Sequence, residues 1–235
     1  MYQKYLAEGE KIILELIDLK PYLIDQLYAL PEFLERQEGK LIAAGIHYFP
    51  VAGKDLERIS NLKTPQNAIA VIRMQDETAM ICQGSELKKV IYLDEVRDPG
   101  NLGTIIRSAD WFGWDLLVLS NECVDPYNPK VVQASMGSLF RLPVIQSGLQ
   151  QFLDEATLSF VIYSAEMDGA SVYETELAFP MLLIMGNESH GVKVMMDHAR
   201  VSKVSIPRYN GQTESLNVAI ACSVMMAEIN RRSYG

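Results

Sequence analysis

This chain has few cysteines and no long apolar run, and each absence excludes a class of protein. The three cysteines, Cys82, Cys123 and Cys222, are odd in number and far apart, so the sequence predicts neither a disulfide framework nor a cysteine metal site. No stretch of about 18 uncharged apolar residues occurs, which argues against a transmembrane helix. Residues 1–20 carry charges among their apolar side chains and lack the continuous apolar core of a signal peptide. We therefore expect a protein of the reducing cytoplasm, with no membrane segment and no metal.

Positive charge is also scarce. The sequence has 21 Lys and Arg against 30 Asp and Glu, a formal net charge of -9, whereas proteins that bind nucleic acid normally show a basic footprint. Only residues 193–235 are basic, with 6 Lys and Arg against 3 Asp and Glu. A nucleic-acid partner would therefore be held by a few placed cations rather than by the overall field.

Two patterns of apolar residues divide the chain, whose hydrophobic content of 49% is enough for a packed core. The first pattern predicts a helix over residues 5–19, a strand over 47–52, a helix over 54–62 and a strand over 68–74. The second predicts strands over residues 90–96, 116–119, 143–145, 160–163, 181–185 and 204–206. Such nearly continuous apolar runs are typical of a mostly parallel sheet covered on both faces. We predict an α/β protein with domains at residues 1–82 and 83–235, the second beginning with the polar linker 83–86.

Residues 98–113, DPGNLGTIIRSADWFG, lie between two predicted strands. Asn101 is suited to cap a helix there, and Gly113 is suited to its C-terminal turn. Arg107 falls in mid-helix at the edge of the apolar face. From spacing alone, a solvated helix cation is a sufficient explanation for this arginine.

Residues 182–191, LLIMGNESHG, predict a buried strand followed by a tight polar turn, and ligands commonly bind where parallel strands end. The turn also resembles the nucleophile elbow of serine hydrolases, with Ser189 as the nucleophile, although Asn187 replaces the first glycine. The later Asp197 and His198 are adjacent on one predicted helix, and adjacent residues do not build a triad well. Hydrolysis is therefore kept as an alternative interpretation.

Residues 204–227 contain a predicted strand, a polar loop and a helix that is apolar and small on nearly every side. Such a helix has to be buried against other elements. Ser215 and Asn217 open it, and the roles of helix cap and first-turn backbone partner would explain them.

In this order and at this spacing, the three segments resemble the three motifs of the SpoU/TrmH family of SPOUT methyltransferases, over roughly residues 88–232. Residues 125–140 also resemble that family. Residues 1–80, with EGEK at 8–11 and TPQNAIAV at 64–71, look like the ribosomal-protein-like RNA-binding domain that many members carry before the catalytic domain.

The resemblance implies a homodimeric RNA 2'-O-ribose methyltransferase that uses S-adenosylmethionine and no metal. Members fold the catalytic domain around a parallel sheet whose C-terminal segment forms a trefoil knot, and they hold the cofactor mainly through backbone groups of the knotted loops. The positions that match those loops here are Ser164, Gly186, Asn187, Ile206 and Leu216. Relatives act on ribosomal RNA or transfer RNA, and the extra N-terminal domain favours ribosomal RNA.

In relatives, the arginine at the position of Arg107 is assigned to activate the ribose hydroxyl. Because a guanidinium is a very poor base, stabilising the developing oxyanion and binding a phosphate is the role that the physics supports better. The other motif residues, implied to orient Arg107, the ribose or the loops, are Asn101, Glu188, Ser215 and Asn217.

Three alternatives stay open: an RNA-binding protein that keeps this fold without its chemistry, the serine hydrolase, and a relative that methylates a base. Binding of S-adenosylmethionine tests the first, a fluorophosphonate label on Ser189 tests the second, and nucleoside analysis of the product tests the third. All motif residues are present, which disfavours the first alternative.

Overall fold

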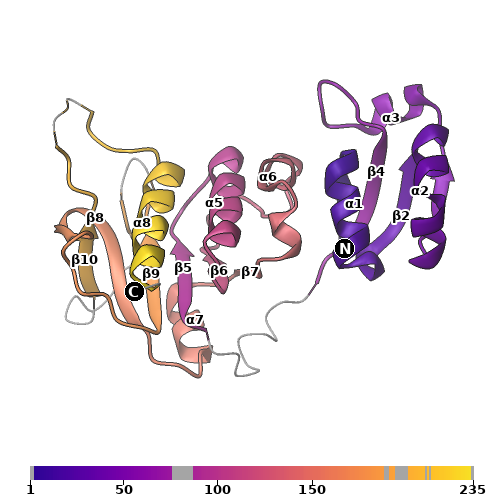
Figure 1. The fold of residues 1–235 in the computed structure, drawn as a ribbon. Coiled ribbons are helices and arrows are strands. Elements are labelled where there is room, and N and C mark those ends of the chain that lie inside the picture. Colours follow the sequence, from indigo (N-terminus) through magenta and orange to yellow (C-terminus); the bar gives the residue numbers. More distant parts are fainter. Residues whose placement is uncertain are drawn as a thin grey trace.

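The computed structural model describes residues 3–75, 87–187, 191–193, 201–209, 211 and 213–233. The chain forms two α/β units, each built on its own sheet (Figure 1). The predicted boundary between residues 82 and 83 lies outside the described residues. No helix in the described parts of the chain is long and apolar enough to cross a membrane.

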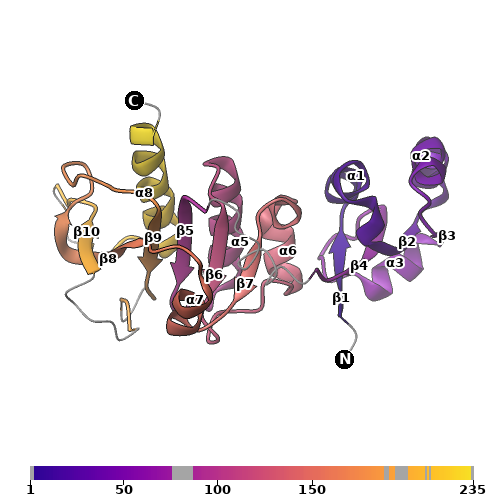
Figure 2. The same cartoon turned by 90° about the horizontal axis from the view of Figure 1, so that it is seen from below.

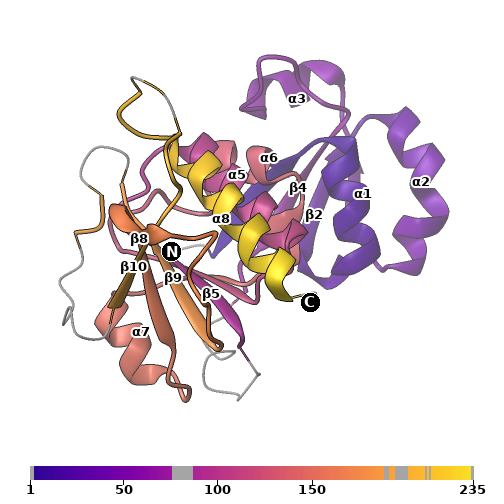
Figure 3. The same ribbon diagram turned by 60° about the vertical axis from the view of Figure 1, so that its left-hand side comes forward.

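The N-terminal unit contains a four-stranded sheet in the order β1-β4-β2-β3. Its elements are β1 (Lys4–Glu8), α1 (Glu10–Leu19), the 3-10 turn η1 (Pro21–Leu23), β2 (Ile24–Ala29), α2 (Pro31–Ala43), β3 (Tyr48–Pro50), α3 (Gly53–Ile59) and β4 (Ala68–Arg73). Strand β4 is antiparallel to both β1 and β2, whereas β2 and β3 are parallel. Helices α1 and α2 lie over the same face of this sheet (Figure 3).

The predicted helix over residues 5–19 was wrong at its start. Lys4–Glu8 forms strand β1, which pairs residue by residue with β4. The helix begins only at Glu10, after Gly9, whose φ of 112° turns the chain out of the strand. Its buried face is the predicted one, formed by Ile12, Ile13, Leu16 and Ile17. Strand β2 and helix α2 were not predicted.

The C-terminal unit contains a six-stranded sheet in the order β10-β8-β9-β5-β6-β7, with every pairing parallel. Its elements are β5 (Lys89–Leu93), α5 (Pro99–Trp111), β6 (Leu116–Leu119), α6 (Pro129–Ser135), the 3-10 turn η2 (Ser138–Phe140), β7 (Val144–Gln146), α7 (Leu149–Glu155), β8 (Val161–Ser171), β9 (Met181–Met185), β10 (Val201–Ser205) and α8 (Val218–Ser233). The predicted parallel sheet is confirmed, although its last strand begins at Val201 rather than at residue 204.

Helices α5, α6 and α8 cover one face of this sheet, and α7 covers the other (Figure 2). Successive residues of β5 alternate between two apolar clusters: Ile91 and Leu93 lie in the cluster with the three helices, and Val90 and Tyr92 lie in the cluster with α7. Every residue of β9 is buried. The continuous apolar runs in the sequence are explained, because both faces of the sheet are covered.

The trefoil knot stays a prediction. Its threading depends on the chain between β9 and β10 and on the loop before α8. Both segments lie partly outside the described residues. The parts outside are residues 188–190 and 194–200 in the first segment, and residues 210 and 212 in the second.

Helix α5 begins at Pro99 and is capped by Asp98, not by Asn101 as predicted. Oδ1 of Asp98 accepts a hydrogen bond from the backbone N–H of Asn101 at 2.8 Å. Further along α5, Gly103 lies so close to α6 that a Cβ atom there would meet the backbone of Val131 and the side chain of Ala134. The glycine therefore allows α5 and α6 to pack in close contact.

Helix α8 begins at Val218, and its first turn is capped by Asn217 rather than by Ser215. Oδ1 of Asn217 accepts a hydrogen bond from the backbone N–H of Ala219 at 3.0 Å. Ser215 lies exposed in the segment before the helix. Serine and asparagine are both good caps, so the sequence did not distinguish these two positions.

Candidate functional site

The carboxyl ends of β5 and β9 lie side by side at one edge of the sheet, and β8 pairs with β9 as far as Ser164 near the same edge, because these strands are parallel. The register pairs Leu93 of β5 with Met185 of β9 and Ser164 of β8 with Ile184 of β9. The segments that follow β5 and β9 are the first and second motifs predicted from the sequence. These two motifs therefore begin side by side.

Gly186 and Asn187 begin a tight turn directly after β9. The backbone N–H of Asn187 donates to the carbonyl oxygen of Gly191 at 3.0 Å, and the N–H of Gly191 donates back to Asn187 at 2.9 Å. A Cβ atom on residue 186 would overlap the backbone of Gly191, so only glycine fits at this position. Glu188, predicted as a motif residue, and Ser189, the alternative nucleophile, lie outside the described residues.

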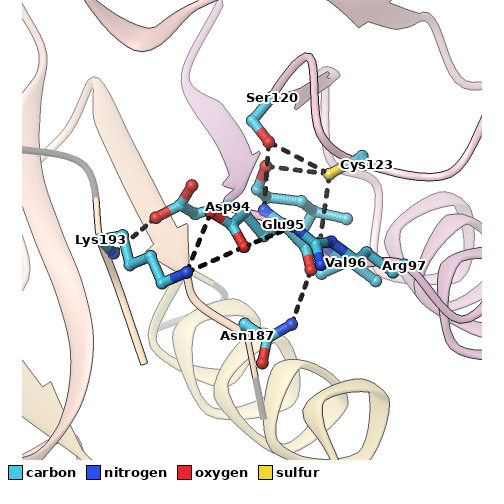
Figure 4. Close-up of polar contacts among 9 residues, drawn as sticks. Asp94, Glu95, Val96, Arg97, Ser120, Cys123, Asn187 and Lys193 are labelled. Carbon is cyan, nitrogen blue, oxygen red and sulfur yellow. Dashed lines mark hydrogen bonds and ion pairs between the residues drawn. The ribbon is translucent and has the colours of Figure 1, made fainter. Parts of the chain in front are cut away.

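Both ends of this turn are attached to the two acidic residues that follow β5 (Figure 4). Nδ2 of Asn187 donates to the carbonyl oxygen of Glu95 at 2.9 Å, and the backbone N–H of Lys193 donates to Oδ2 of the buried Asp94 at 2.6 Å. Nζ of Lys193 lies 3.2 Å from Oε2 of Glu95, which also pairs with Arg97 at 3.0 Å. Asp94, Glu95 and Lys193 were not predicted from the sequence, although two acids directly after an apolar strand were a visible signal.

The backbone at Glu95 is held in the left-handed region, with φ of 56°. Oγ of Ser120 accepts a hydrogen bond from the N–H of Glu95 at 3.1 Å. Sγ of Cys123 accepts from the N–H of Val96 at 3.3 Å and donates to the carbonyl oxygen of Leu93 at 3.3 Å. Burial raises the pKa of the Cys123 thiol, so it stays protonated and serves as a structural donor.

The remaining predicted cofactor residues lie on three segments. Ser164 is buried in β8, where its hydroxyl donates to Oε1 of Glu166 at 3.0 Å. Ile206 directly follows β10, and Leu216, 48% exposed, lies in the segment before α8. The backbone N–H and C=O groups of Ile206 and Leu216 make no hydrogen bond with any described residue, so they can bind a ligand.

Asn101 and Asn217 bring the first and third motifs together. Nδ2 of Asn217 donates to Oδ1 of Asn101 at 3.0 Å. A second contact joins the same two helices, since Oγ of Ser223 donates to Oγ of Ser108 at 2.9 Å. The start of α8 is therefore held beside the first turn of α5.

Arg107 does not join these residues. It is exposed in mid-α5 and makes no hydrogen bond or ion pair with any residue that the structure describes. Arg107 and Asn101 are six positions apart on a helix, so their side chains point in directions about 120° apart. Thr104 and Trp111 share the outer face of α5 with Arg107, and Trp111 is 83% exposed.

Comparisons with known proteins agree on one family. The profile of the SpoU rRNA Methylase family matches residues 88–227. The chain is 32% identical to the 23S rRNA (guanosine(2553)-2'-O)-methyltransferase RlmP of Bacillus subtilis, over 94% of this chain and 86% of that protein. Among solved structures, an AdoMet-bound rRNA methyltransferase from Sinorhizobium meliloti matches with a TM-score of 0.85 and 29% identity, covering 98% of this chain and 88% of that one. The SpoU methyltransferase AviRb from Streptomyces viridochromogenes, in complex with AdoMet, matches with a TM-score of 0.83 and 25% identity, covering 99% and 91%.

We predict that Gly186→Ala weakens binding of S-adenosylmethionine by more than about tenfold, because the added Cβ displaces the turn from its place beside Gly191. Isothermal titration calorimetry measures the dissociation constant. The control is Gly148→Ala, the same substitution at a glycine with an ordinary φ of -64° and no atom within 4 Å of an added Cβ. Unchanged affinity in the Gly186 variant would show that this turn does not shape the cofactor site.

Proposed function

This chain belongs to the SpoU rRNA methylase family, and we propose that it transfers the methyl group of S-adenosylmethionine to a ribose 2'-hydroxyl of ribosomal RNA. The observation that carries the proposal is the meeting of the family's motif segments, with Gly186 after β9 and the Asn101–Asn217 pair at the ends of α5 and α8. Ribosomal RNA is favoured over transfer RNA, because two relatives that match both units, RlmP of Bacillus subtilis and the enzyme from Sinorhizobium meliloti, are named for ribosomal RNA. We place this activity in the cytoplasm, where bacteria modify their ribosomal RNA.

We propose that the cofactor is held largely by backbone groups. The residues assigned to this site are Ser164, Gly186, Asn187, Ile206 and Leu216. The chemistry of this donor set fits, because an adenine edge needs one donor and one acceptor, and the backbone of Ile206 and Leu216 offers both. Bound S-adenosylmethionine would supply an electrophilic methyl group. The chain's own contribution is to fix the turn at Gly186, which Glu95 after β5 and Gly191 hold in place through their bonds to Asn187.

We assign Arg107 to stabilise negative charge on the ribose oxygen and to bind an RNA phosphate. Its exposed guanidinium has no partner among the described residues, so its five N–H donors can bind oxygen atoms of the substrate. It stays charged throughout and does not need to accept the proton. Asn101, Ser215 and Asn217 are assigned to orient the ribose and the loops, and Glu188 keeps the same assignment from the sequence motif.

We propose that residues 1–82 form the RNA-binding domain. Support comes from a separate sheet, and from cations on α3 and in the loop after it, Lys54, Arg58 and Lys63, which form no ion pair with any described residue. By contrast, two arginines near the C-terminus form hydrogen bonds and ion pairs within the fold. Arg231 and Arg232 both bond Glu228, which lowers the pKa of that carboxyl to about 2.

We propose a homodimer formed through the outer faces of α5 and α8. These faces expose two large apolar side chains, Trp111 at 83% and Ile220 at 55%, which a partner surface would cover. Arg107 lies on the same outer face of α5, pointing away from Asn101. A two-fold axis here would bring Arg107 of one protomer toward the cofactor site of its partner.

The proposed activity is tested on ribosomal RNA from a strain that lacks this protein. The purified protein is incubated with S-adenosylmethionine and that RNA, and the nucleosides are analysed by mass spectrometry. We expect a single new 2'-O-methyl nucleoside. A methyl group on a base, or none on RNA from any source, would contradict the proposal.

Arg107→Ala should lower the turnover number at least about 100-fold, because one preformed donor to the developing charge is lost. The affinity for S-adenosylmethionine should stay within about twofold, since the assigned cofactor residues lie on other segments. Arg107→Lys keeps the charge but loses the forked donors, and we expect it to recover only a small part of the rate. Turnover near the parent rate in the alanine variant would refute the assignment.

Light scattering at micromolar concentration should give about twice the chain mass of 26.4 kDa. Ile220→Glu should shift the protein toward monomer, because it places a charge in the proposed apolar interface. The matched control is Ile42→Glu on α2, which changes an isoleucine that is 65% exposed outside the proposed interface. A fully active monomer would rule out the shared site.

A further inference from the structure

The two α/β units touch along one narrow region, where α6 and η2 lie between the N-terminal unit and α5. The ring of Tyr5 on β1 lies 4.6 Å from the ring of Tyr127, centroid to centroid. The carboxylate of Glu15 on α1 lies against Gly137, whose φ of 90° and lack of a Cβ leave room for it. The N-terminal unit therefore contacts the C-terminal unit through this ring pair and this charged side chain, beside an apolar cluster that continues from one unit into the other.

The two units are not closely packed along the whole of their interface. A cavity of about 230 Å³ lies between β1 and α6. Its lining comes from both units, including Leu6, Asn61 and Leu62 on one side and Pro129, Val132 and Ala134 on the other. Since domain orientation is normally mobile unless the interface is large and well packed, specific polar contacts beside this cavity help to fix the orientation of the two units.

Arg141, directly after η2, forms polar contacts with three other residues at this boundary. Its Nε and Nη2 donate to Oδ2 of Asp110 on α5 at 2.8 Å and 2.6 Å, and Nη2 also donates to Oγ of Ser138 at 3.1 Å. Its Nη1 forms an ion pair with Oε1 of Glu15. Within the described parts of the chain, this is the ion pair that joins the two units.

The three charged side chains are partly shielded from water. Their side-chain exposures are 34% for Arg141, 28% for Glu15 and 21% for Asp110. A guanidinium presents its donors in a planar fork, so one arginine can bind two carboxylates on different sides, which a lysine ammonium does less well. The arrangement is thus specific to arginine.

Asp110 lies three residues after Arg107, one turn further along α5. Glu15, Arg141 and Asp110 therefore form a polar path from the N-terminal unit to the proposed catalytic helix. RNA held by the N-terminal unit has to reach Arg107 in one geometry, and a misplacement of about 1 Å can cost a large part of the rate.

We propose that Arg141 is a positioning residue that joins Glu15 to Asp110 and so holds the RNA-binding unit at a fixed orientation to the helix that carries Arg107. This inference rests on the proposed function, because it requires that the N-terminal unit binds the RNA. This bridge of Glu15, Arg141 and Asp110 affects where bound RNA lies relative to Arg107, and it leaves the cofactor site unchanged.

Glu15→Gln tests the bridge with little disturbance, because the amide keeps the size of the carboxylate and the carboxylate has no other ion pair among the described residues. We expect the KM for ribosomal RNA to rise about threefold to fivefold, with the affinity for S-adenosylmethionine unchanged. The matched control is Glu10→Gln on the same helix, which removes an ion pair with Arg36 inside the N-terminal unit. This control should leave both values at the parent level.

A double-mutant cycle with Arg141→Gln completes the test. If the two residues act as one bridge, the double variant should have the same KM for RNA as the Arg141 single variant. Parent kinetics in Glu15→Gln, or effects of the two changes that add, would overturn the proposal. A failure of the proposed function itself would look different, because the parent protein would then methylate no RNA.

Discussion

The parallel pairing of β5 with β9 is the constraint on which the rest of the site depends. This pairing ends at Leu93 and Met185, so the chain leaves both strands at the same edge and at the same height. The turn that starts at Gly186 then bonds to the backbone and carboxylate of the two residues after β5. The register between β5 and β9 thus fixes the relative positions of the first two motifs. A slip of this register by one residue would shift one motif against the other.

The third motif reaches the site through helix packing rather than through the sheet. Helix α5 packs closely on α6 at Gly103 and bonds to α8 through Ser108 and Asn101. The helix that carries Arg107 is therefore held on both flanks, while its outer face is left in solvent. Rigid support on the flanks of an exposed side chain is the arrangement that the catalytic role proposed for Arg107 requires.

The net charge of -9 is compatible with an RNA substrate when the ion pairs are considered one by one. Many acidic residues are neutralised within the fold, as Asp25 is by Lys4 and Arg73, which together lower its pKa. Arg107, by contrast, has no ion pair among the described residues. Because exposed charges are screened beyond roughly 10 Å at ordinary salt, the local cation matters more to a phosphate than the distant excess of acid.

The sequence by itself determined the α/β class, the parallel sheet and the motif positions. Apolar runs such as residues 181–185 are local patterns, and burial on both faces of a strand produces them directly. Only the tertiary structure decided that Lys4–Glu8 is a strand, because its pairing partner β4 lies more than sixty residues away. The same holds for the bond between Asp94 and Lys193, separated by 99 positions, and for Arg141 between Glu15 and Asp110. Periodicity reports which side of an element is buried, whereas the choice of a polar partner depends on how distant segments meet in space.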